Sequence, residues 1–213
     1  MRIMSESIEL RAYTFLDSMQ PAFASFVGTT ARGFLPVQGQ AALFIEIAPG
    51  IAINRLTDIA CKATDVRPGI QVVERAFGLL EFHSDSQSEV LSAGHHILES
   101  LEKSEEDRLR PVVKSSQIIT NVDPDQAQLI NKSRYGDMLL GGETLYILEV
   151  HPAAYAATAA NEAEKASPIK LIQMQPFGAF GRLYLGGTES NIREGAQAAI
   201  AALESVEGRE NKP

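Results

Sequence analysis

Val66 to Leu80 reads Val-Arg-Pro-Gly-Ile-Gln-Val-Val-Glu-Arg-Ala-Phe-Gly-Leu-Leu, and the same outline returns 103 positions later as Ile169 to Leu183. Both segments carry Ala-Phe-Gly at matching positions near their ends. The two residues before that triplet differ, being Glu74-Arg75 in the first copy and Phe177-Gly178 in the second. The chain therefore repeats a strand-turn-strand pattern and places a charged pair in only one of the two turns.

The repeat extends well beyond this stretch. Residues 42–80 align with residues 145–183 without a gap, and nine positions are identical. Matches of Pro, Lys and Phe-Gly in one register are not expected from an alanine-rich composition alone. The sequence therefore predicts a tandem duplication of a unit of about 100 residues. The identical positions, numbered in the first copy, are Glu46, Pro49, Ala60, Lys62, Ala63, Ala76, Phe77, Gly78 and Leu80.

The composition is typical of a soluble globular protein, with 45% hydrophobic and 22% charged residues. A net charge of −8 argues against nonspecific binding to nucleic acid or to an anionic membrane. The sequence contains no apolar run long enough to span a bilayer and no signal-peptide core, so we expect a cytoplasmic protein. Its single cysteine, Cys61, excludes an internal disulfide and a cysteine-pair metal site within one chain.

Both halves predict the same order of strands and helices, which gives a chain built from two like α/β units. In the first half we expect strands at 8–15, 42–47, 70–73 and 77–82, a short helix after the first strand, and helices at 51–64 and 87–101. In the second half we expect strands at 111–120, 145–150, 169–174 and 180–185, and helices at 126–131, 153–166 and 190–206.

Local signals mark helix starts and domain boundaries. Ser86 with Glu89 fits a capping box, and Asp123 before Pro124 fits an N-cap followed by a first-turn proline. The polar segment Glu102 to Arg110 is the best linker candidate. The expected domains are residues 8–107 and 110–206, followed by a polar, frayed tail at 207–213.

No pattern of a catalytic or metal site stands out. Adjacent helix residues His95-His96 point about 100° apart and cannot chelate one ion together. His83 and His151 are isolated, and the glycines of 178–187 match neither a dinucleotide nor a phosphate loop. Cys61 is interpreted as a small core residue rather than a reactive thiol. We therefore expect no enzyme, no cofactor and no metal.

Two lysines on predicted helices have matching partners. Asp58 and Lys62 are four residues apart, and Asn161 and Lys165 repeat the spacing, so each pair shares a helix face. Such a pair is either a solvated ion pair of small effect or part of an interface. The lysine is one of the few identities between the copies, which favours an interface.

Several motifs resemble the bacterial microcompartment shell domain. They are Glu149-Val150 to Pro152, Ala-Ala-Asn-Glu-Ala-Glu-Lys-Ala at 159–166 and Gly-Ala-Phe-Gly-Arg-Leu at 178–183. With the tandem arrangement, further segments make the chain similar to the tandem-domain carboxysome shell proteins of cyanobacteria, over nearly all of residues 9–207. These segments are Leu16-Asp17, Pro49-Gly50-Ile51, 66–69, 115–119, 126–131 and 142–146.

The resemblance implies an α/β (α+β, ferredoxin-like) fold class and circularly permuted shell domains, in which a strand and short helix that end the ordinary domain come first. It implies a homotrimeric pseudohexamer in the carboxysome shell, tiling with hexameric shell proteins, and two trimers stacked around a chamber. It also implies roles for particular residues. The pore gate would be Glu74 and Arg75, the pore lining Phe177, Gly178 and Ala179, and the tile edge Asp58, Lys62, Asn161 and Lys165.

Other functions remain open from the residues. A redox tile with an iron–sulfur cluster on the three-fold axis would need a cysteine in a pore turn, and neither 73–78 nor 176–181 has one. A small-molecule sensor built on the duplicated domain would behave as a monomer. A shell protein of another kind of microcompartment would share the tile architecture.

Overall fold

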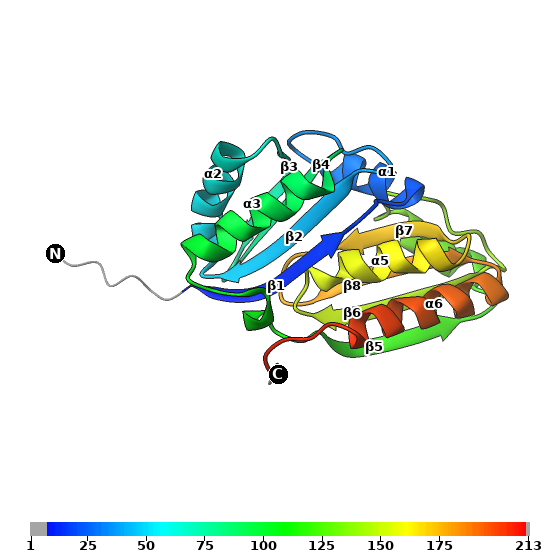
Figure 1. Cartoon of the computed structure of the whole chain (residues 1–213). Coiled ribbons are helices and arrows are strands. Elements are labelled where there is room, and N and C mark those ends of the chain that lie inside the picture. The colour runs from blue at the N-terminus through cyan, green and yellow to red at the C-terminus, as the bar shows by residue number, and fades with distance from the viewer. Residues whose placement is uncertain (1–7, 212–213) are drawn as a thin grey trace.

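Two antiparallel four-stranded sheets lie side by side, each built from one half of the chain (Figure 1). This computed structural model describes residues 8–211. The first half contains β1 (Glu9–Leu16), α1 (Pro21–Thr30), β2 (Ala41–Ala48), η1 (Gly50–Ala52), α2 (Ile53–Ala63), β3 (Arg67–Glu74), β4 (Phe77–Ser84), α3 (Gln87–Ser100) and η2 (Glu105–Asp107). The second contains β5 (Val112–Ile119), α4 (Pro124–Asn131), β6 (Thr144–His151), α5 (Tyr155–Ala166), β7 (Lys170–Gln175), β8 (Gly181–Gly187) and α6 (Glu189–Glu204).

The two sheets have the same topology and register. Their strand orders are β1-β2-β4-β3 and β5-β6-β8-β7. Thr14 pairs with Phe44, and Gln117 pairs with Ile147, so strand pairing keeps the 103-residue offset seen in the sequence. Irregularities in the first strand of each half also fall at matching positions. The predicted tandem α+β duplication is confirmed.

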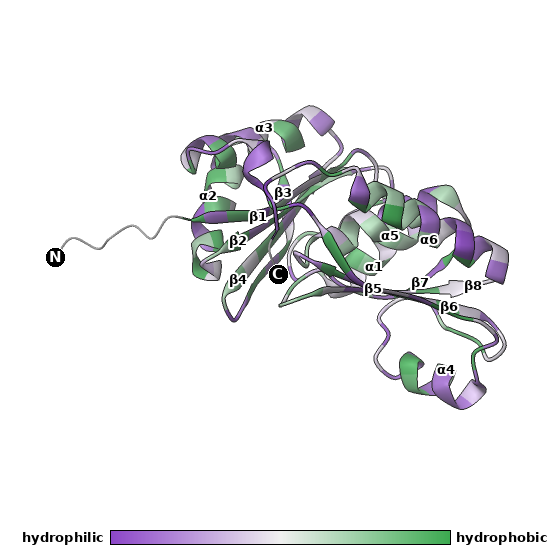
Figure 2. Ribbon diagram, turned by 90° about the horizontal axis from the view of Figure 1, so that it is seen from below, coloured by the Kyte–Doolittle hydropathy of each residue, from purple (hydrophilic) through white to green (hydrophobic). Residues whose placement is uncertain are grey.

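Helices cover both faces of each sheet. In the first half α2 and α3 lie on one face, and in the second half α5 and α6 lie on one face while α4 lies on the other (Figure 2). Successive side chains of a strand point to opposite faces. Ile45 and Ile47 accordingly join the core beneath α2 and α3, whereas Ala42 and Phe44 join the core shared with the second half.

The junction between the halves is a continuous hydrophobic core. Helix α1 contacts α5 and β7, and β1 contacts α5. Phe23 and Phe26 of α1 are buried in the same cluster as Ala156 and Ala160 of α5. Because α5 is rich in alanine, the elements of the first half approach its backbone closely. The two domains therefore pack as one body at this junction.

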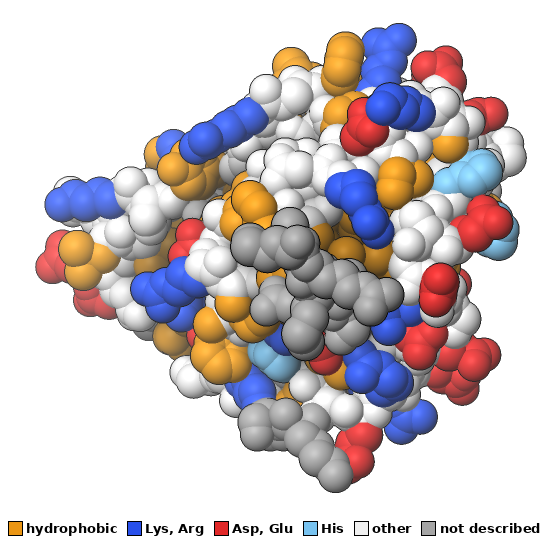
Figure 3. Space-filling view, turned by 90° about the vertical axis from the view of Figure 1, so that its left-hand side faces the viewer, with side chains coloured by type: hydrophobic (Ala, Val, Ile, Leu, Met, Phe, Trp, Pro, Cys, Tyr) orange, Lys and Arg blue, Asp and Glu red, His pale blue; other side chains and the backbone are white. Residues whose placement is uncertain are grey.

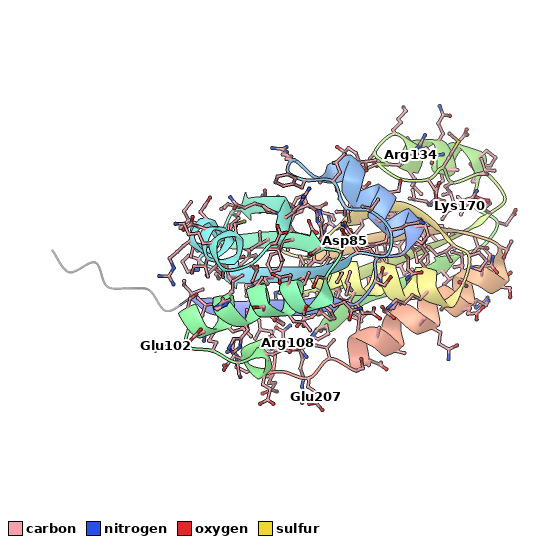
Figure 4. All side chains as sticks on the ribbon, turned by 45° about the horizontal axis from the view of Figure 1, so that its top comes forward. Asp85, Glu102, Arg108, Arg134, Lys170 and Glu207 are labelled. Carbon is pink, nitrogen blue, oxygen red and sulfur yellow. The ribbon has the colours of Figure 1, made fainter. Side chains whose placement is uncertain are left out.

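The linker and the chain end are held by hydrogen bonds. The Arg108 guanidinium donates to the Glu207 carbonyl oxygen (2.8 Å), and both residues lie beside η2 (Figure 4). The buried Asn211 amide donates to the Arg110 carbonyl oxygen (2.9 Å). The prediction of a frayed tail at 207–213 is therefore wrong up to Asn211, because these donors dock it onto the linker. Its last two residues lie outside the described part of the chain.

The cap predictions hold in part. The Ser86 hydroxyl accepts the Glu89 backbone N–H (3.3 Å), and the Asp123 carboxylate accepts the Asp125 backbone N–H (2.8 Å). The Glu89 carboxylate, however, accepts the backbone N–H of Asp65 (3.0 Å) instead of reaching back to Ser86. The capping box is therefore only half formed. The Glu89 carboxylate instead connects the start of α3 to the residues that follow α2.

Candidate pore turn and edge residues

The charged pair of the first copy lies at the tip of the β3–β4 hairpin. Glu74 ends β3 and pairs with Phe77, which leaves Arg75 and Ala76 as a two-residue loop. Arg75 has φ +52°, in the left-handed region that residues other than glycine seldom adopt. Two-residue hairpin loops need such a conformation because it matches the twist of the strands. The tight hairpin therefore fixes the backbone of Arg75.

The side chains at this tip are exposed and loosely paired. Arg75 is 90% exposed and Glu74 is 46% exposed, and 3.7 Å separates Arg75 Nε from Glu74 Oε1. An ion pair of this kind contributes little because water screens it. Within residues 8–211 no closer acid contacts the Arg75 guanidinium. The backbone of the tip is fixed, but its charged side chains are free to reorient.

The equivalent turn of the second half is longer and uncharged. Strand β7 ends at Gln175 because Pro176 has no N–H to donate to the sheet, and β8 begins only at Gly181. Gly178 has φ +99°, a conformation suited to glycine, and Gln175 Nε2 donates to the Phe177 carbonyl oxygen (3.3 Å). Ala179 is exposed.

The two turns lie next to one another. A Cβ added at Gly178 would be 3.8 Å from Glu74 Cγ, so the uncharged turn of one domain contacts the charged turn of the other. A groove of about 750 Å³ runs from this point between the edge strands β3 and β7. Residues predicted for the gate and for the pore lining are thus brought together within one chain.

Close packing supports the charged hairpin from below. A Cβ at Gly78 would collide with the carbonyl oxygen of Gly50, so the start of β4 lies directly against η1. The Arg11 guanidinium stacks over the Phe77 ring, with Cζ 3.6 Å from the ring centroid. The tip therefore projects from a rigid base.

Arg11 also belongs to a buried polar network that the sequence did not predict. Its Nε donates to Glu46 Oε1 (2.7 Å), and Glu46 Oε2 accepts the Ala154 backbone N–H at the start of α5 (2.9 Å). Arg11 Nη2 donates to His151 Nε2 (2.8 Å). Burial raises the pKa of the Glu46 carboxyl, and the Arg11 guanidinium acts against that shift. The network joins β1 and β2 of one domain to α5 and β6 of the other.

The two predicted edge lysines differ in their surroundings. Lys62 Nζ forms an exposed ion pair with Asp58 Oδ2 (2.7 Å) on α2. Lys165 Nζ is partly buried and reaches across the domain junction to Asp17 Oδ1 (2.7 Å). Hydrogen bonding from Lys165 lowers the pKa of the Asp17 carboxyl. The two copies of this lysine therefore occupy one exposed and one partly covered position.

Asn161 does not lie on an exposed edge, and that expectation is wrong. Its side chain is fully buried, where Oδ1 accepts the Gln20 backbone N–H (2.9 Å) and Nδ2 donates to the Ser18 carbonyl oxygen (3.3 Å). The start of α1 covers this face of α5, so Asn161 satisfies backbone groups of the first domain.

Cys61 and the histidines form no site of their own. Cys61 is exposed on α2, which corrects the prediction of a core residue. His83 and Glu81 are both buried, with Nδ1 of the ring 2.8 Å from Glu81 Oε1, and burial raises the pKa of Glu81. Glu81 and His83 are two residues apart in β4, so both side chains lie on the same face of the strand. This spacing is visible in the sequence and could have predicted the pair. Across the described residues no group of three His, Cys, Asp or Glu side chains is placed to hold a metal ion.

Comparison with known proteins identifies the family. Residues 10–107 match the family model described as the CsoS1D N-terminal domain. The chain is 57% identical over 204 residues to the carboxysome shell protein CcmP of Synechococcus elongatus, covering 96% of each protein. The chain belongs to the tandem-domain carboxysome shell proteins. This shell protein is also 50% identical to the carboxysome shell protein CsoS1D of Hydrogenovibrio crunogenus, over 93% of the chain and 98% of that relative.

Solved structures share the whole fold of this carboxysome shell protein. The fused permuted hexameric shell protein MSM0275 from the RMM microcompartment superposes with a TM-score of 0.91 at 44% identity, covering 94% of this chain and 99% of that one. The double ringed trimeric shell protein MSM0271 from the same microcompartment gives 0.92 at 39% identity, covering 96% and 100%. The permuted tandem architecture is therefore confirmed. The helices within the described range include none that is both long and apolar enough to span a bilayer.

Proposed function

We propose that three copies of this chain form a pseudohexameric tile with a central pore, in a structural and not an enzymatic role. Each chain supplies two successive domains, residues 8–107 and 110–206. The observation that carries the proposal is the contact between the Glu74-Arg75 tip and the turn at Gly178. The two turns occupy equivalent positions in the two repeats, and in a symmetric ring equivalent turns lie at the same distance from the axis. Because the two turns of one chain contact each other, both face the pore.

The pore turns form the gate. Three Glu74-Arg75 tips alternate around the axis with three turns that contain Phe177, Gly178 and Ala179. With the side chains paired across the axis the aperture is closed, and with them turned away it is open, which makes the tip a two-state element. The loose 3.7 Å pairing within one chain leaves both arrangements accessible.

The arginines favour anions as the passing metabolites. A ring of guanidinium groups attracts phosphorylated molecules over a Debye length of about 8 Å at physiological salt. Ribulose bisphosphate and phosphoglycerate, the anions that a carboxysome exchanges, fit this chemistry. Guanidinium groups bind phosphate oxygens in pairs, so the same side chains serve both gating and selection.

A permeability assay tests the gate. Shells or liposomes that contain the E74A/R75A variant should pass anions faster than those with the unchanged chain, because the pore can no longer close. The matched control is E189A/R193A, which removes an exposed pair of similar charge on α6 (2.6 Å) away from the turns. Unchanged anion passage in E74A/R75A would reject the gate assignment.

The tile edge is proposed at Lys62 and Lys165, where the trimer meets hexameric shell proteins of the carboxysome. Replacing both lysines by alanine should weaken sheet formation and leave trimers intact, as scored by electron microscopy and light scattering. Undiminished tiling would contradict the edge role.

Stacking of two trimers is proposed from exposed apolar residues at equivalent loop positions. Leu35 is 66% exposed and Met138, its equivalent at the 103-residue offset, is 48% exposed. The double ringed structural neighbour supports a second trimer as the occupant of this surface. The variant L35D/M138D should sediment as single trimers, and persistence of a six-chain species would exclude these loops from the stacking contact.

A further inference from the structure

One buried pair of ionisable side chains has no part in the proposed tile or pore. Glu81 and His83 of β4 are 0% and 1% exposed, and Nδ1 of the ring lies 2.8 Å from Glu81 Oε1. Among the described residues, Glu81 Oε2 and His83 Nε2 have no hydrogen-bond partner. Acidic, basic and histidine side chains at the end of the molecule that carries α2 stand at the surface instead (Figure 3). Burying a carboxylate with one partner is costly, and a purely structural tile does not require it.

The pair lies under the loop that joins α1 to β2, residues 31–40, which we call the first loop. The backbone N–H of Gly33 donates to the Gly69 carbonyl oxygen, and that of Phe34 donates to the Pro68 carbonyl oxygen, both at 3.0 Å. Most side chains of the loop are exposed. Backbone hydrogen bonds to β3 therefore hold the first loop, and it can open locally while the sheet stays folded.

The unpaired oxygen of Glu81 faces the backbone of this loop. A Cβ added at Gly69 would collide with Glu81 Oε2, and it would lie 2.9 Å from the Phe34 carbonyl oxygen and 3.3 Å from His83 Cε1. The three groups therefore surround one point, which only glycine leaves open. Two acceptor oxygens placed in this way repel each other, whereas a protonated carboxyl has an O–H that a carbonyl oxygen can accept. The protonation of Glu81 thus decides whether this contact holds the loop or opposes it.

Few charged groups face the pair from the elements packed around it. Helix α1 carries none. On β3, Arg67 is exposed and lies over the Phe34 ring, with Cζ 5.4 Å from the ring centroid. On β2, Glu46 points to the same face but accepts Arg11 Nε (2.7 Å). The remaining charged residues on these elements are at least partly exposed, and they are Arg32, Glu74 and Asp85. The buried carboxyl therefore depends on His83 and on its own proton.

That dependence fixes the direction in which pH acts. With Glu81 ionised and His83 neutral the pair carries one negative charge, and one added proton makes it neutral. Burial raises the pKa of the Glu81 carboxyl, while His83 and the backbone amides of Ile70 and Gly69 act against the shift. A carboxyl whose pKa is raised by folding stabilises the folded form below its usual pKa of 4.5, and this contribution is lost as pH rises through the raised value. Rising pH therefore weakens the contact with the loop.

We propose that one proton held by the Glu81–His83 pair latches the first loop to β3, and that loss of this proton frees the loop and loosens the stack of two trimers. The second part rests on the proposed stacking, because Leu35 of that contact lies in the first loop beside Phe34 and is 66% exposed. The latch itself is a property of the single chain.

The equivalent loop of the second domain, residues 134–143, provides an internal control. It repeats both backbone hydrogen bonds to its sheet at the 103-residue offset. These bonds run from the Gly136 N–H to the Ile172 carbonyl oxygen (3.0 Å) and from the Asp137 N–H to the Leu171 carbonyl oxygen (2.8 Å). The positions of Glu81 and His83 are taken by Tyr184 and Gly186. This second loop therefore docks in the same way without a buried acid–histidine pair.

Hydrogen–deuterium exchange of the unchanged chain, read by mass spectrometry, tests the latch. The ratio of exchange at Gly33 and Phe34 to exchange at Gly136 and Asp137 cancels the intrinsic pH dependence of amide exchange. Release of one proton changes the opening equilibrium by up to about tenfold per pH unit, so we expect the ratio to rise about tenfold or more from about pH 5 to about pH 8.5. A ratio that stays constant over this range would overturn the latch.

Two variants assign the effect to the buried acid. Glutamine stays uncharged and can donate an N–H in place of the acid's O–H, so in E81Q the ratio should keep its low acidic value at every pH. The matched control is D85N, because the exposed Asp85 accepts Gln40 Nε2 beside the same loop (3.0 Å) and its loss should leave the rise intact. If E81Q does not fold, E81Y/H83G takes its place, since it copies the second domain. A rise that persists without Glu81, or that disappears in D85N, would contradict the proposal.

Sedimentation of the same chains over the same pH range tests the consequence for stacking. The six-chain fraction should fall as pH rises in the unchanged chain and stay constant in E81Q. Single trimers at every pH would reject the proposed stacking, while the exchange ratio would still decide the latch. A six-chain fraction that ignores pH while the exchange ratio rises would refute the link between the latch and the stack.

Discussion

Replacement of Glu46 by glutamine tests how the buried network joins the two domains. Glu46 is 1% exposed and its partner Arg11 is 7% exposed, with 2.7 Å between Oε1 and Nε. Glutamine keeps the shape and can still accept the Ala154 N–H, so the change removes mainly the charge. The guanidinium is then buried without its acid, apart from Glu9 at 3.8 Å. Breaking a buried pair in this way costs about 3–5 kcal/mol.

Urea unfolding at fixed protein concentration measures the effect, because association would otherwise add to the apparent stability. We expect the free energy of unfolding to fall by about 3 kcal/mol, since Glu9 offsets part of the loss. The matched control is Glu189→Gln, which removes the acid of an exposed pair with Arg193 and should cost less than about 1 kcal/mol. Equal small losses in both variants would refute the reasoning. The double replacement R11M/E46L should recover much of the stability because it leaves no unpaired charge.

Gly78→Ala should destabilise the fold by roughly 1–3 kcal/mol because the new methyl group meets Gly50, whereas Gly28→Ala, with open space around it, should stabilise by about 0.4–1 kcal/mol. Equal effects in urea unfolding would contradict the close packing beneath the turn. Acidification should weaken the domain junction through His151. Burial, then Arg11 and Lys114, lower the pKa of this ring, while Asn211 and Glu9 oppose the shift. The neutral ring is therefore favoured in the fold, and stability is lost as pH falls from 6.5 through the lowered pKa. A His151→Asn variant with an unchanged pH profile between pH 7.5 and 5 would argue against this role.

The repeat and its elements were predictable because the signals are local or periodic. The gapless match of residues 42–80 to 145–183 correctly predicts two like sheets, and the N-caps at Ser86 and Asp123 depend only on the next few residues. The docked tail was not predictable. Asn211 and Arg110 lie far apart in sequence, and nothing in a short polar segment shows that a distant carbonyl accepts its amide.

The sequence showed which residues make up the candidate site, but it did not show what packs around them. The Glu74-Arg75 asymmetry is visible in the sequence, whereas its contact with Gly178 requires the packing of both domains. Asn161 and Asp58 occupy matching positions on matching helices, yet one is buried and the other exposed. Helical spacing gives the face on which a residue lies, but it does not say whether another domain covers that face.

Equivalent positions of the two domains carry different side chains where the other domain covers only one of them. At the internal junction Ala154, Thr14 and Thr158 are small and buried, because a covalent linkage keeps the partner always present. Their equivalents at the 103-residue offset, Ile51, Gln117 and Arg55, are larger or more polar, and all three are exposed. The two hairpin turns also differ between the repeats. In the proposed trimer, Glu74-Arg75 alternates around the axis with an uncharged turn, which would give three gates per pore and leave the other three turns as lining.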